Sequence, residues 1–306
     1  MPITFEIIAG EDANSSKIIA SGEDQSIATD KELIKFGVHQ SALKDALAIA
    51  LGKRPDNVYT RRPTPSGWED YYLTEALEEV TRVLEVESAK ITEISSQPEI
   101  VSDFELTNPS SFKGEFIGQI THNKTHTLSS SRSNGGELEV GQKLTYKVEA
   151  LGSGVGGETS VRFAANWSKE TVTTDSINLG TLGRVQVTLE PGQSVIAQLS
   201  ASAGTIKARV RYKAFLKGDT LVHYDQQYNG HYFWFRNIQI PMYVANIENS
   251  IEVVEDIEIG YYSRFVVRLI DKKSGDLMQA IDMTDIPANS FFNDTSSPID
   301  KSPVID

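Results

Sequence analysis

Apolar and polar residues alternate with a period of two along most of the chain from about residue 84 onward. Such alternation is typical of antiparallel strands that bury one face. The alternating segments are 185–189, 195–199, 206–214, 238–247, 251–260 and 262–271. Pro191-Gly192 between the first two suits the central positions of a type II turn. The pattern predicts a mainly β fold with an elongated antiparallel body.

Helical periodicity is concentrated in the first part of the chain. Thr29 and Glu32 have the spacing of a capping box, and apolar residues recur at helical spacing over 33–50. Gly52 then suits a helix C-terminus. A second helix is expected at 74–84, and helices are expected only in this part. The sequence thus predicts a small helix-containing N-terminal domain.

The distribution of charge along the chain supports a boundary between these two parts. The net charge of the 306 residues is −13, and residues 1–111 carry 10 basic against 20 acidic side chains. Pro109 and its Ser neighbours favour a boundary there. The predicted divisions are an α/β head at 1–110, an elongated β module at 111–292 and a flexible C-terminal tail at 293–306. The head is the expected receptor-binding part. A net acidic chain is poorly suited to binding nucleic acid, so no nucleic-acid partner is expected.

Composition narrows the chemistry further. The chain has no cysteine, which excludes disulfides, thiolate metal sites and a cysteine nucleophile. No apolar stretch approaches the ~20 residues of a spanning helix, and the N-terminus shows no basic and apolar leader pattern. We therefore expect a soluble protein. No motif indicates catalysis or a metal site. Gly152, Gly154 and Gly157 have the spacing of a dinucleotide-binding motif, but a strand pattern rather than a helix follows them, so no cofactor is expected.

The most informative segment is an amphipathic hairpin, expected at about 138–172. Apolar residues share one parity at 144–150 and again at 161–167, and charged residues hold the other parity. Seven Ser or Thr stand among the thirteen residues of 121–133 and seven among the eighteen of 159–176. Such alternation fits a transmembrane β-strand pair, and it equally fits a hairpin that packs one face on the body.

The hairpin with its flanking Ser/Thr-rich strands, followed by VTLEPGQSVIAQLSASAGTIKARVRYKAFLKGD, resembles the ETX/MTX2 branch of aerolysin-like β-pore-forming toxins. The resemblance covers about 110–270. It implies a non-enzymatic toxin that is released, acts extracellularly and binds a target cell membrane through an unknown protein or glycan receptor. It also implies a homo-oligomer whose inserted hairpins form a transmembrane β-barrel, with insecticidal action as one expectation. The helix expected within 30–51 departs from the mostly β head of many members.

The resemblance assigns roles within the hairpin. The expected lipid-facing residues are Leu144, Tyr146, Val148, Ala150, Val161, Phe163, Ala165 and Trp167. The expected tip residues are Leu151 and Val155. The expected lumen-facing residues are Lys147, Glu149, Arg162 and Asn166.

An aromatic run provides a candidate receptor contact through Tyr224, Tyr228, Tyr232 and Trp234. Aromatic residues anchor interfaces, but they also dominate cores, and a doubly buried strand is the competing interpretation. An alternative function for the whole chain is a carbohydrate-binding or storage protein that keeps this scaffold without inserting. Movement of the hairpin in the presence of membranes distinguishes the two functions.

Overall fold

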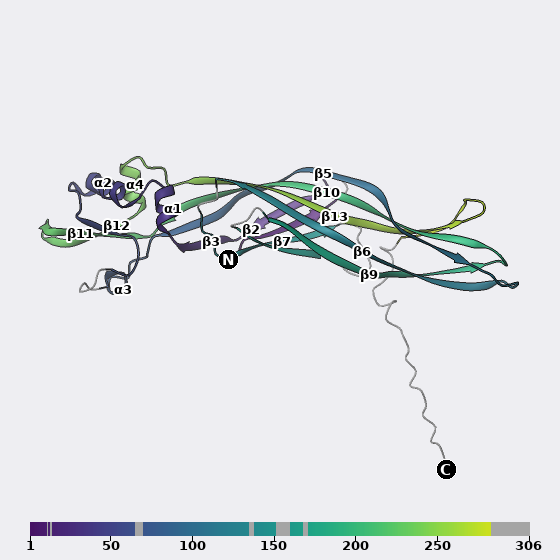
Figure 1. The fold of residues 1–306 in the computed structure, drawn as a ribbon. Helices are drawn as coiled ribbons and strands as arrows, with labels where there is room; N and C mark the ends of the chain where they lie inside the picture. Colours follow the sequence, from purple (N-terminus) through teal and green to yellow (C-terminus); the bar gives the residue numbers. More distant parts are fainter. Residues whose placement is uncertain are drawn as a thin grey trace, which may run out of the picture.

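The fold is known from a computed structural model, which describes residues 1–10, 12, 14–64, 70–134, 138–150, 160–167 and 171–282. Of residues 119–126, 150, 160–166, 171–184, 263–264 and 282, only the backbone is described. The molecule is elongated, with helices at one end and long strands running toward the other (Figure 1). We call the end that carries α2, α4, β11 and β12 the helical end.

The strands and helices alternate only near the N-terminus. The strands are β1 Thr4–Ala9, β2 Lys17–Ser21, β3 Glu23–Ile27, β4 Asn57–Tyr59, β5 Thr81–Thr107, β6 Gly114–Ser133, β7 Lys143–Ala150, β8 Ser160–Asn166, β9 Thr171–Leu189, β10 Ser194–Lys217, β11 Asp219–Tyr228, β12 His231–Asn237, β13 Ile251–Asp271 and β14 Leu277–Asp282. The helices are α1 Asp30–Lys35, α2 Gln40–Leu51, α3 Tyr71–Thr74 and α4 Gln239–Val244. The prediction of a mainly β fold is confirmed.

Three sheets organise these strands. The long sheet has the order β3-β5-β10-β13-β6-β9, with β14 on β13. The hairpin sheet has the order β2-β1-β7-β8, and a small sheet, β12-β11-β4, lies at the helical end. Elements from the predicted segment 1–110 occur in all three sheets, and β5 runs the length of the long sheet to Thr107. The proposed division at residue 110 stays a prediction.

Two hydrophobic cores fill the molecule. The proximal core joins the hairpin sheet, the long sheet and the helical end through residues such as Phe5, Tyr212 and Leu47. The distal core lies at the other end, between β9, β10 and β13, and contains residues such as Leu199 and Leu269. The same strand, β10, contributes to both cores because its alternating side chains are buried along nearly its whole length. The long strands therefore tie the two ends together.

Local signals in the first part of the chain are confirmed at several positions. Thr29 caps α1 and makes the predicted capping box with Glu32. Gly52, with φ of 84°, ends α2. The single helix expected over 33–50 is instead two helices, α1 and α2. They are separated near Gly37, whose φ of 73° interrupts the α conformation.

Four other predictions are wrong. The segment 74–84 is not a helix, because β5 begins at Thr81 and pairs with β10 there. The segment 238–247 contains helix α4 instead of a strand, and Pro241 is tolerated because it lies in the first turn. This helix also overturns the expectation that helices are confined to the first part. The two strands expected over 251–271 are one continuous strand, β13.

The turn at Pro191-Gly192 is confirmed between β9 and β10. Gly192 has φ of 71°, and the Gln193 backbone N–H donates to the Glu190 carbonyl at 3.0 Å. A left-handed residue at this position is what a type II turn requires. The turn joins two strands that both contribute to the distal core.

Candidate functional site

The predicted hairpin exists as β7 paired antiparallel with β8, in register from Lys143↔Asn166 to Glu149↔Ser160. Its other edge, on β7, pairs with β1 in parallel. The predicted residues whose backbone alone is described are Ala150, Val161, Arg162, Phe163, Ala165 and Asn166. The predicted tip residues Leu151 and Val155 lie outside the described residues.

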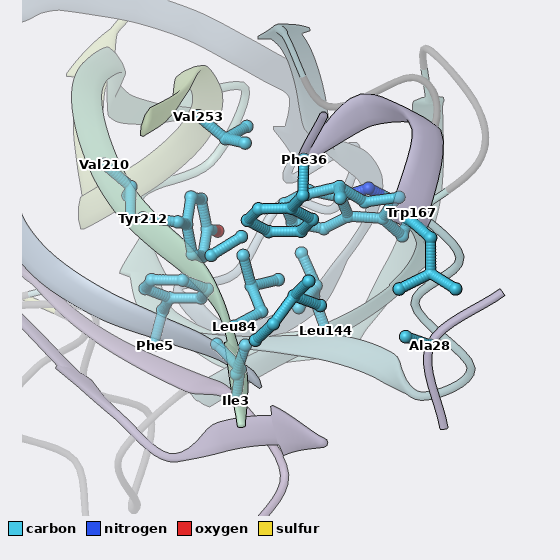
Figure 2. Close-up of a cluster of buried hydrophobic side chains, with 14 of the residues drawn as sticks. Ile3, Phe5, Ala28, Phe36, Leu84, Leu144, Trp167, Val210, Tyr212 and Val253 are labelled. Atoms are coloured by element: carbon cyan, nitrogen blue, oxygen red, sulfur yellow. The ribbon is translucent and has the colours of Figure 1, made fainter. Parts of the chain in front are cut away.

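The apolar face of the hairpin packs against the long sheet. Leu144 and Tyr146 are fully buried, Val148 is 2% exposed, and Trp167 just after β8 is 5% exposed. Figure 2 shows Leu144 and Trp167 among the side chains of this core, which includes Leu84 and Tyr212 of the long sheet. In this conformation Leu144, Tyr146 and Val148, three of the expected lipid-facing residues, are core residues of the protein.

Aromatic contacts position the hairpin against β1 and the long sheet. The Tyr146 ring stacks on Phe5 of β1, with centroids 4.9 Å apart and planes 13° apart. The Trp167 ring meets Tyr212 of β10 edge to face at 5.3 Å, and the Arg132 guanidinium lies 4.7 Å above the Trp167 ring. Such pairs add about 0.5–1.5 kcal/mol each beyond the area they bury. Strand β7 and the residue that follows β8 are thus held by specific contacts.

The opposite face of β7 is polar and partly exposed. The side chains of Lys147 and Glu149 are 29% and 22% exposed, and they form an ion pair with each other. Lys147 also lies 3.5 Å from the Glu6 carboxylate on β1. The hydrogen bond with Glu149 raises the pKa of Lys147 above its usual value. The alternation read from the sequence therefore separates a buried apolar face from a charged outer face.

A buried carboxylate holds the body of the hairpin. Glu255 of β13 is fully buried. It accepts hydrogen bonds from the hydroxyls of Tyr146, at 2.9 Å, and Tyr212, and pairs with the Arg132 guanidinium. Arg132 in turn donates to the Trp167 carbonyl at 3.1 Å. We call Glu255, Arg132, Tyr146 and Tyr212 the exit clasp, because Trp167 is where the chain leaves the hairpin.

Burial and the Glu255 charge have a clear electrostatic consequence. Desolvation first, and then the nearby Glu255 carboxylate, raise the pKa of Tyr146 and of Tyr212 well above the usual tyrosine value. Both hydroxyls therefore stay protonated and keep donating to Glu255 throughout the neutral range. The cluster has no spare negative charge for a proton-transfer role.

A second buried cluster holds the entry to the hairpin. Arg82 of β5 is fully buried and pairs with Glu32 of α1 at 3.0 Å and with Asp24 of β3 at 2.5 Å. It also donates to the carbonyl of Glu139 at 2.8 Å, and the Glu139 N–H donates to Glu32 at 3.1 Å. We call Arg82, Glu32 and Asp24 the entry clasp, because Glu139 precedes β7.

Sequence reasoning missed both clasps, although each left a signal. Glu255 occupies the buried parity of β13, between Val253 and Ile257. Arg82 likewise falls between Val80 and Leu84, which are both fully buried. A charged residue on the apolar parity of a strand indicates a buried, paired charge, since an unpaired one is too costly to bury.

The candidate receptor residues lie on the small sheet at the helical end, with different exposures. Tyr224 is fully buried, and its hydroxyl donates to the Lys53 carbonyl at 2.7 Å. Tyr228 donates to the Leu51 carbonyl, and the Trp234 indole donates to the Tyr228 carbonyl at 3.3 Å. Tyr232 is 47% exposed. No residue of β12 is buried, so β12 is not a doubly buried strand. Tyr224 nevertheless belongs to the proximal core, and Tyr228 and Trp234 pack against it, so the core interpretation holds for part of the run.

Other kinds of site find little support in the described part of the chain. A pocket of about 490 Å³ lies beside α1 and α2 and is lined by Tyr59, Arg61 and Leu43, among others. No group of three or more His, Asp or Glu side chains among the described residues is placed to hold a metal ion. Within the same residues, no helix is both long and apolar enough to cross a membrane.

No family model matches the chain. Two sequence relatives nevertheless show the family to which it belongs. It is 30% identical over 263 residues to U-megalopygitoxin(8)-Mc8 of Megalopyge crispata, covering 86% of this chain and 90% of that protein. It is 31% identical over 250 residues to U-megalopygitoxin(8)-Mo15 of Megalopyge opercularis, covering 82% and 78%.

Among solved structures, the fold is similar to that of parasporin-2, a Bacillus thuringiensis toxin described as recognising cancer cells. The TM-score is 0.52 at 17% identity, over 85% of this chain and 100% of that one. Parasporin-2 is an ETX/MTX2-type toxin, so the fold inferred from the sequence is confirmed. The chain belongs to the U-megalopygitoxin(8) family and has the aerolysin-like fold of the ETX/MTX2-type β-pore-forming toxins.

Proposed function

We propose that this chain is a non-catalytic pore-forming toxin that binds a target membrane, assembles with further copies and inserts the β7–β8 hairpin into a transmembrane β-barrel. The observation that carries the proposal is the two-faced hairpin. Its buried face is apolar at Leu144, Tyr146 and Val148, and its outer face is charged at Lys147 and Glu149. In a barrel, the first face would meet lipid and the second the water-filled lumen.

The energetics favour a conditional rather than a spontaneous insertion. In the monomer, the apolar face is removed from water at roughly 25 cal/mol per Å² of buried surface. Lipid offers the same face a comparable apolar environment. Closure of the barrel pairs every strand edge, which a single hairpin in lipid cannot do. Insertion is therefore expected only after several copies have gathered on a membrane.

The test uses the absence of cysteine in the chain. Single cysteines at 146, 147, 148 and 149 carry an environment-sensitive dye, and liposomes made from target-cell lipid extracts are added. Positions 146 and 148 are already in an apolar core in the monomer, so the liposomes contain a nitroxide-labelled lipid that quenches dyes in contact with acyl chains. Insertion predicts quenching of the dyes at 146 and 148 and unquenched, aqueous emission at 147 and 149. A vesicle dye-release assay on the same samples reports whether a pore has opened.

The matched control lies in the distal part of β13. Val267 is 1% exposed, and Arg268 beside it is exposed. Dyes at these two positions are expected to keep their emission when membranes are added, because the distal core stays folded. Unchanged emission at all four hairpin positions, on membranes that bind the protein, would instead favour a carbohydrate-binding protein that does not insert.

Receptor binding is assigned in this proposal to the helical end. Of the four candidate aromatics, Tyr232 offers the most accessible ring, and Trp234 lies next to it on β12. Tyr224 supports the site from beneath through its bond to the Lys53 carbonyl. Tyr232→Ala is expected to weaken cell binding without changing the melting temperature, whereas unchanged cell binding would remove this residue from the receptor contact.

A further inference from the structure

The two edges of β7 have different partners in the monomer. One edge pairs with β8, antiparallel, within the hairpin. The other edge pairs with β1, parallel, over six residue pairs from Thr4↔Thr145 to Ala9↔Ala150. The Thr145 N–H donates to the Ile3 carbonyl at the start of this ladder. Within the described sheet, β8 is the terminal strand on the other side.

A strand edge accepts one partner at a time, since each backbone N–H and C=O on it is used by the neighbour. In a barrel built from hairpins of several copies, the outer edge of β7 must pair with a hairpin strand of the next copy. That neighbour is antiparallel, because the strands alternate in direction around the barrel. The parallel β1 and the neighbouring copy therefore compete for the same edge of β7.

The monomer holds β1 in place from several sides. Ile3, Phe5 and Ile7 are at most 1% exposed in the proximal core, and β2 covers the edge of β1 that faces away from β7. The Met1 carbonyl accepts from the Glu23 N–H at 2.8 Å, which ties the start of the chain to β3. The N-terminal strand is thus fixed to the body independently of its contact with β7.

We propose that β1 is a strap that closes the assembly edge of β7, and that β8 of a second copy replaces it there. This inference rests on the proposed function. The interaction surface is the outer edge of β7, and its partner is the terminal strand of another copy of this chain. Head-to-tail contacts of this kind close into a ring when the rotation between copies allows. Separation of β1 from β7 is consequently a required step before pore formation.

The experiment fastens β1 to β7 with a disulfide. Thr4 and Thr145 are register partners, and neither has an assigned role in the pore. The variant Thr4→Cys with Thr145→Cys is oxidised, and bond formation is verified by intact mass. We expect the oxidised protein to bind target-lipid liposomes, yet to lose at least about 90% of its dye release and its SDS-resistant oligomer. Reduction is expected to restore both.

A matched disulfide controls for the cross-link itself. Thr4 and Ser21 are register partners on the outer face of β1 and β2, with their hydroxyls 3.0 Å apart. Oxidised Thr4→Cys with Ser21→Cys fastens β1 to β2 and leaves β7 free, so full activity is expected. Loss of activity in this control as well would overturn the assignment of the effect to the β1–β7 edge.

The outcomes separate the two proposals. Full activity of the oxidised Thr4→Cys, Thr145→Cys protein would overturn the strap and leave the pore proposal standing. A reduced variant and a wild-type protein that both fail to release dye would overturn the proposed function, and the strap with it. A second readout measures the separation of β1 from β7 directly. A dye at 147 that is quenched by Glu6→Trp is expected to brighten when liposomes are added. Constant quenching while the vesicles release their dye would also overturn the strap.

Discussion

The two hydrophobic cores differ in what they contain besides apolar side chains. The distal core is built from aliphatic and aromatic residues, and the ion pairs near it, such as Lys272 with Glu105, are exposed. The proximal core surrounds the buried charged residues of the described chain, which are Asp24, Glu32, Arg82 and Glu255. Both clasps contact the hairpin or its flanks.

Under the proposed function, this difference marks the hairpin as the part that separates from the body. Apolar packing is non-directional and gives a stable interior. A buried ion pair adds little net stability, because desolvation offsets most of the attraction, but removal of one partner is very costly. The buried charges beside the hairpin thus specify one position of the hairpin on the body. They add little to the free energy needed to detach the whole hairpin. The distal core needs no such property.

The largest effect is expected from Arg82→Met. The substitution leaves Glu32 and Asp24 buried without their counter-charge, and it frees the Glu139 carbonyl. The expected loss in unfolding free energy is about 3–5 kcal/mol, measured by urea denaturation. If Arg82→Met lowers the unfolding free energy by less than about 1 kcal/mol, the entry clasp is hydrated and is not a buried cluster.

A pair of leucine truncations compares the two cores directly. Leu144→Ala in the hairpin and Leu269→Ala in the distal core both remove a fully buried side chain. Each is expected to cost about 2–5 kcal/mol of global stability. Hydrogen exchange should differ, because only Leu144→Ala accelerates local opening of the β7 amides. Equal acceleration in both variants would remove the distinction between a releasable hairpin and a permanent distal core.

The exit clasp is tested by Tyr146→Phe, which keeps the ring stacked on Phe5 and removes the hydroxyl that donates to Glu255. The expected cost is about 1.5–3 kcal/mol, since the bond is to a charged group. Tyr261→Phe is the matched control, because the buried Tyr261 hydroxyl has no hydrogen-bond partner among the described residues. Its expected change in unfolding free energy is close to zero, and a change equal to that of Tyr146→Phe would contradict the clasp.

Alkaline pH should weaken the proximal core through the same tyrosines. The pKa values of Tyr146 and Tyr212 are raised in the folded state, so the folded protein binds more protons than the unfolded chain above about pH 10. Stability is then fully present below pH 10 and falls as the pH rises, by about 1.4 kcal/mol per pH unit for each such group. Denaturation curves between pH 9 and pH 11 measure this slope, and Tyr146→Phe should make it shallower. An unchanged slope would contradict the assignment.

The smallest effect is expected from an exposed ion pair. Arg209 and Asp256 lie 2.7 Å apart on the surface, with side chains 44% and 53% exposed. Solvent and salt screen such pairs, so Arg209→Gln is expected to change the unfolding free energy by less than about 1 kcal/mol. Urea denaturation beside Arg82→Met gives the contrast between exposed and buried charges. A loss of unfolding free energy comparable to that of Arg82→Met would contradict this contrast between exposed and buried charges.

Sequence by itself determined which residues share a face. The alternation over 144–149 placed Leu144, Tyr146 and Val148 together and Lys147 with Glu149, because successive strand side chains point to opposite sides. The capping box at Thr29 and the turn at Gly192 were likewise readable, since both depend on residues a few positions apart. The mainly β class followed from the same local patterns.

Only the tertiary structure decided what those faces and edges meet. The pairing of β1 with β7, over 140 positions away in sequence, has no local signature. Neither does the burial of Tyr224, whose hydroxyl donates to the Lys53 carbonyl. Helix α4 formed where alternation predicted a strand, because its contacts with α2 outweigh local propensity. The clasps arise where Arg82 and Glu255 meet partners from distant elements. Periodicity fixes the direction of a side chain, whereas its partner depends on how the whole chain packs.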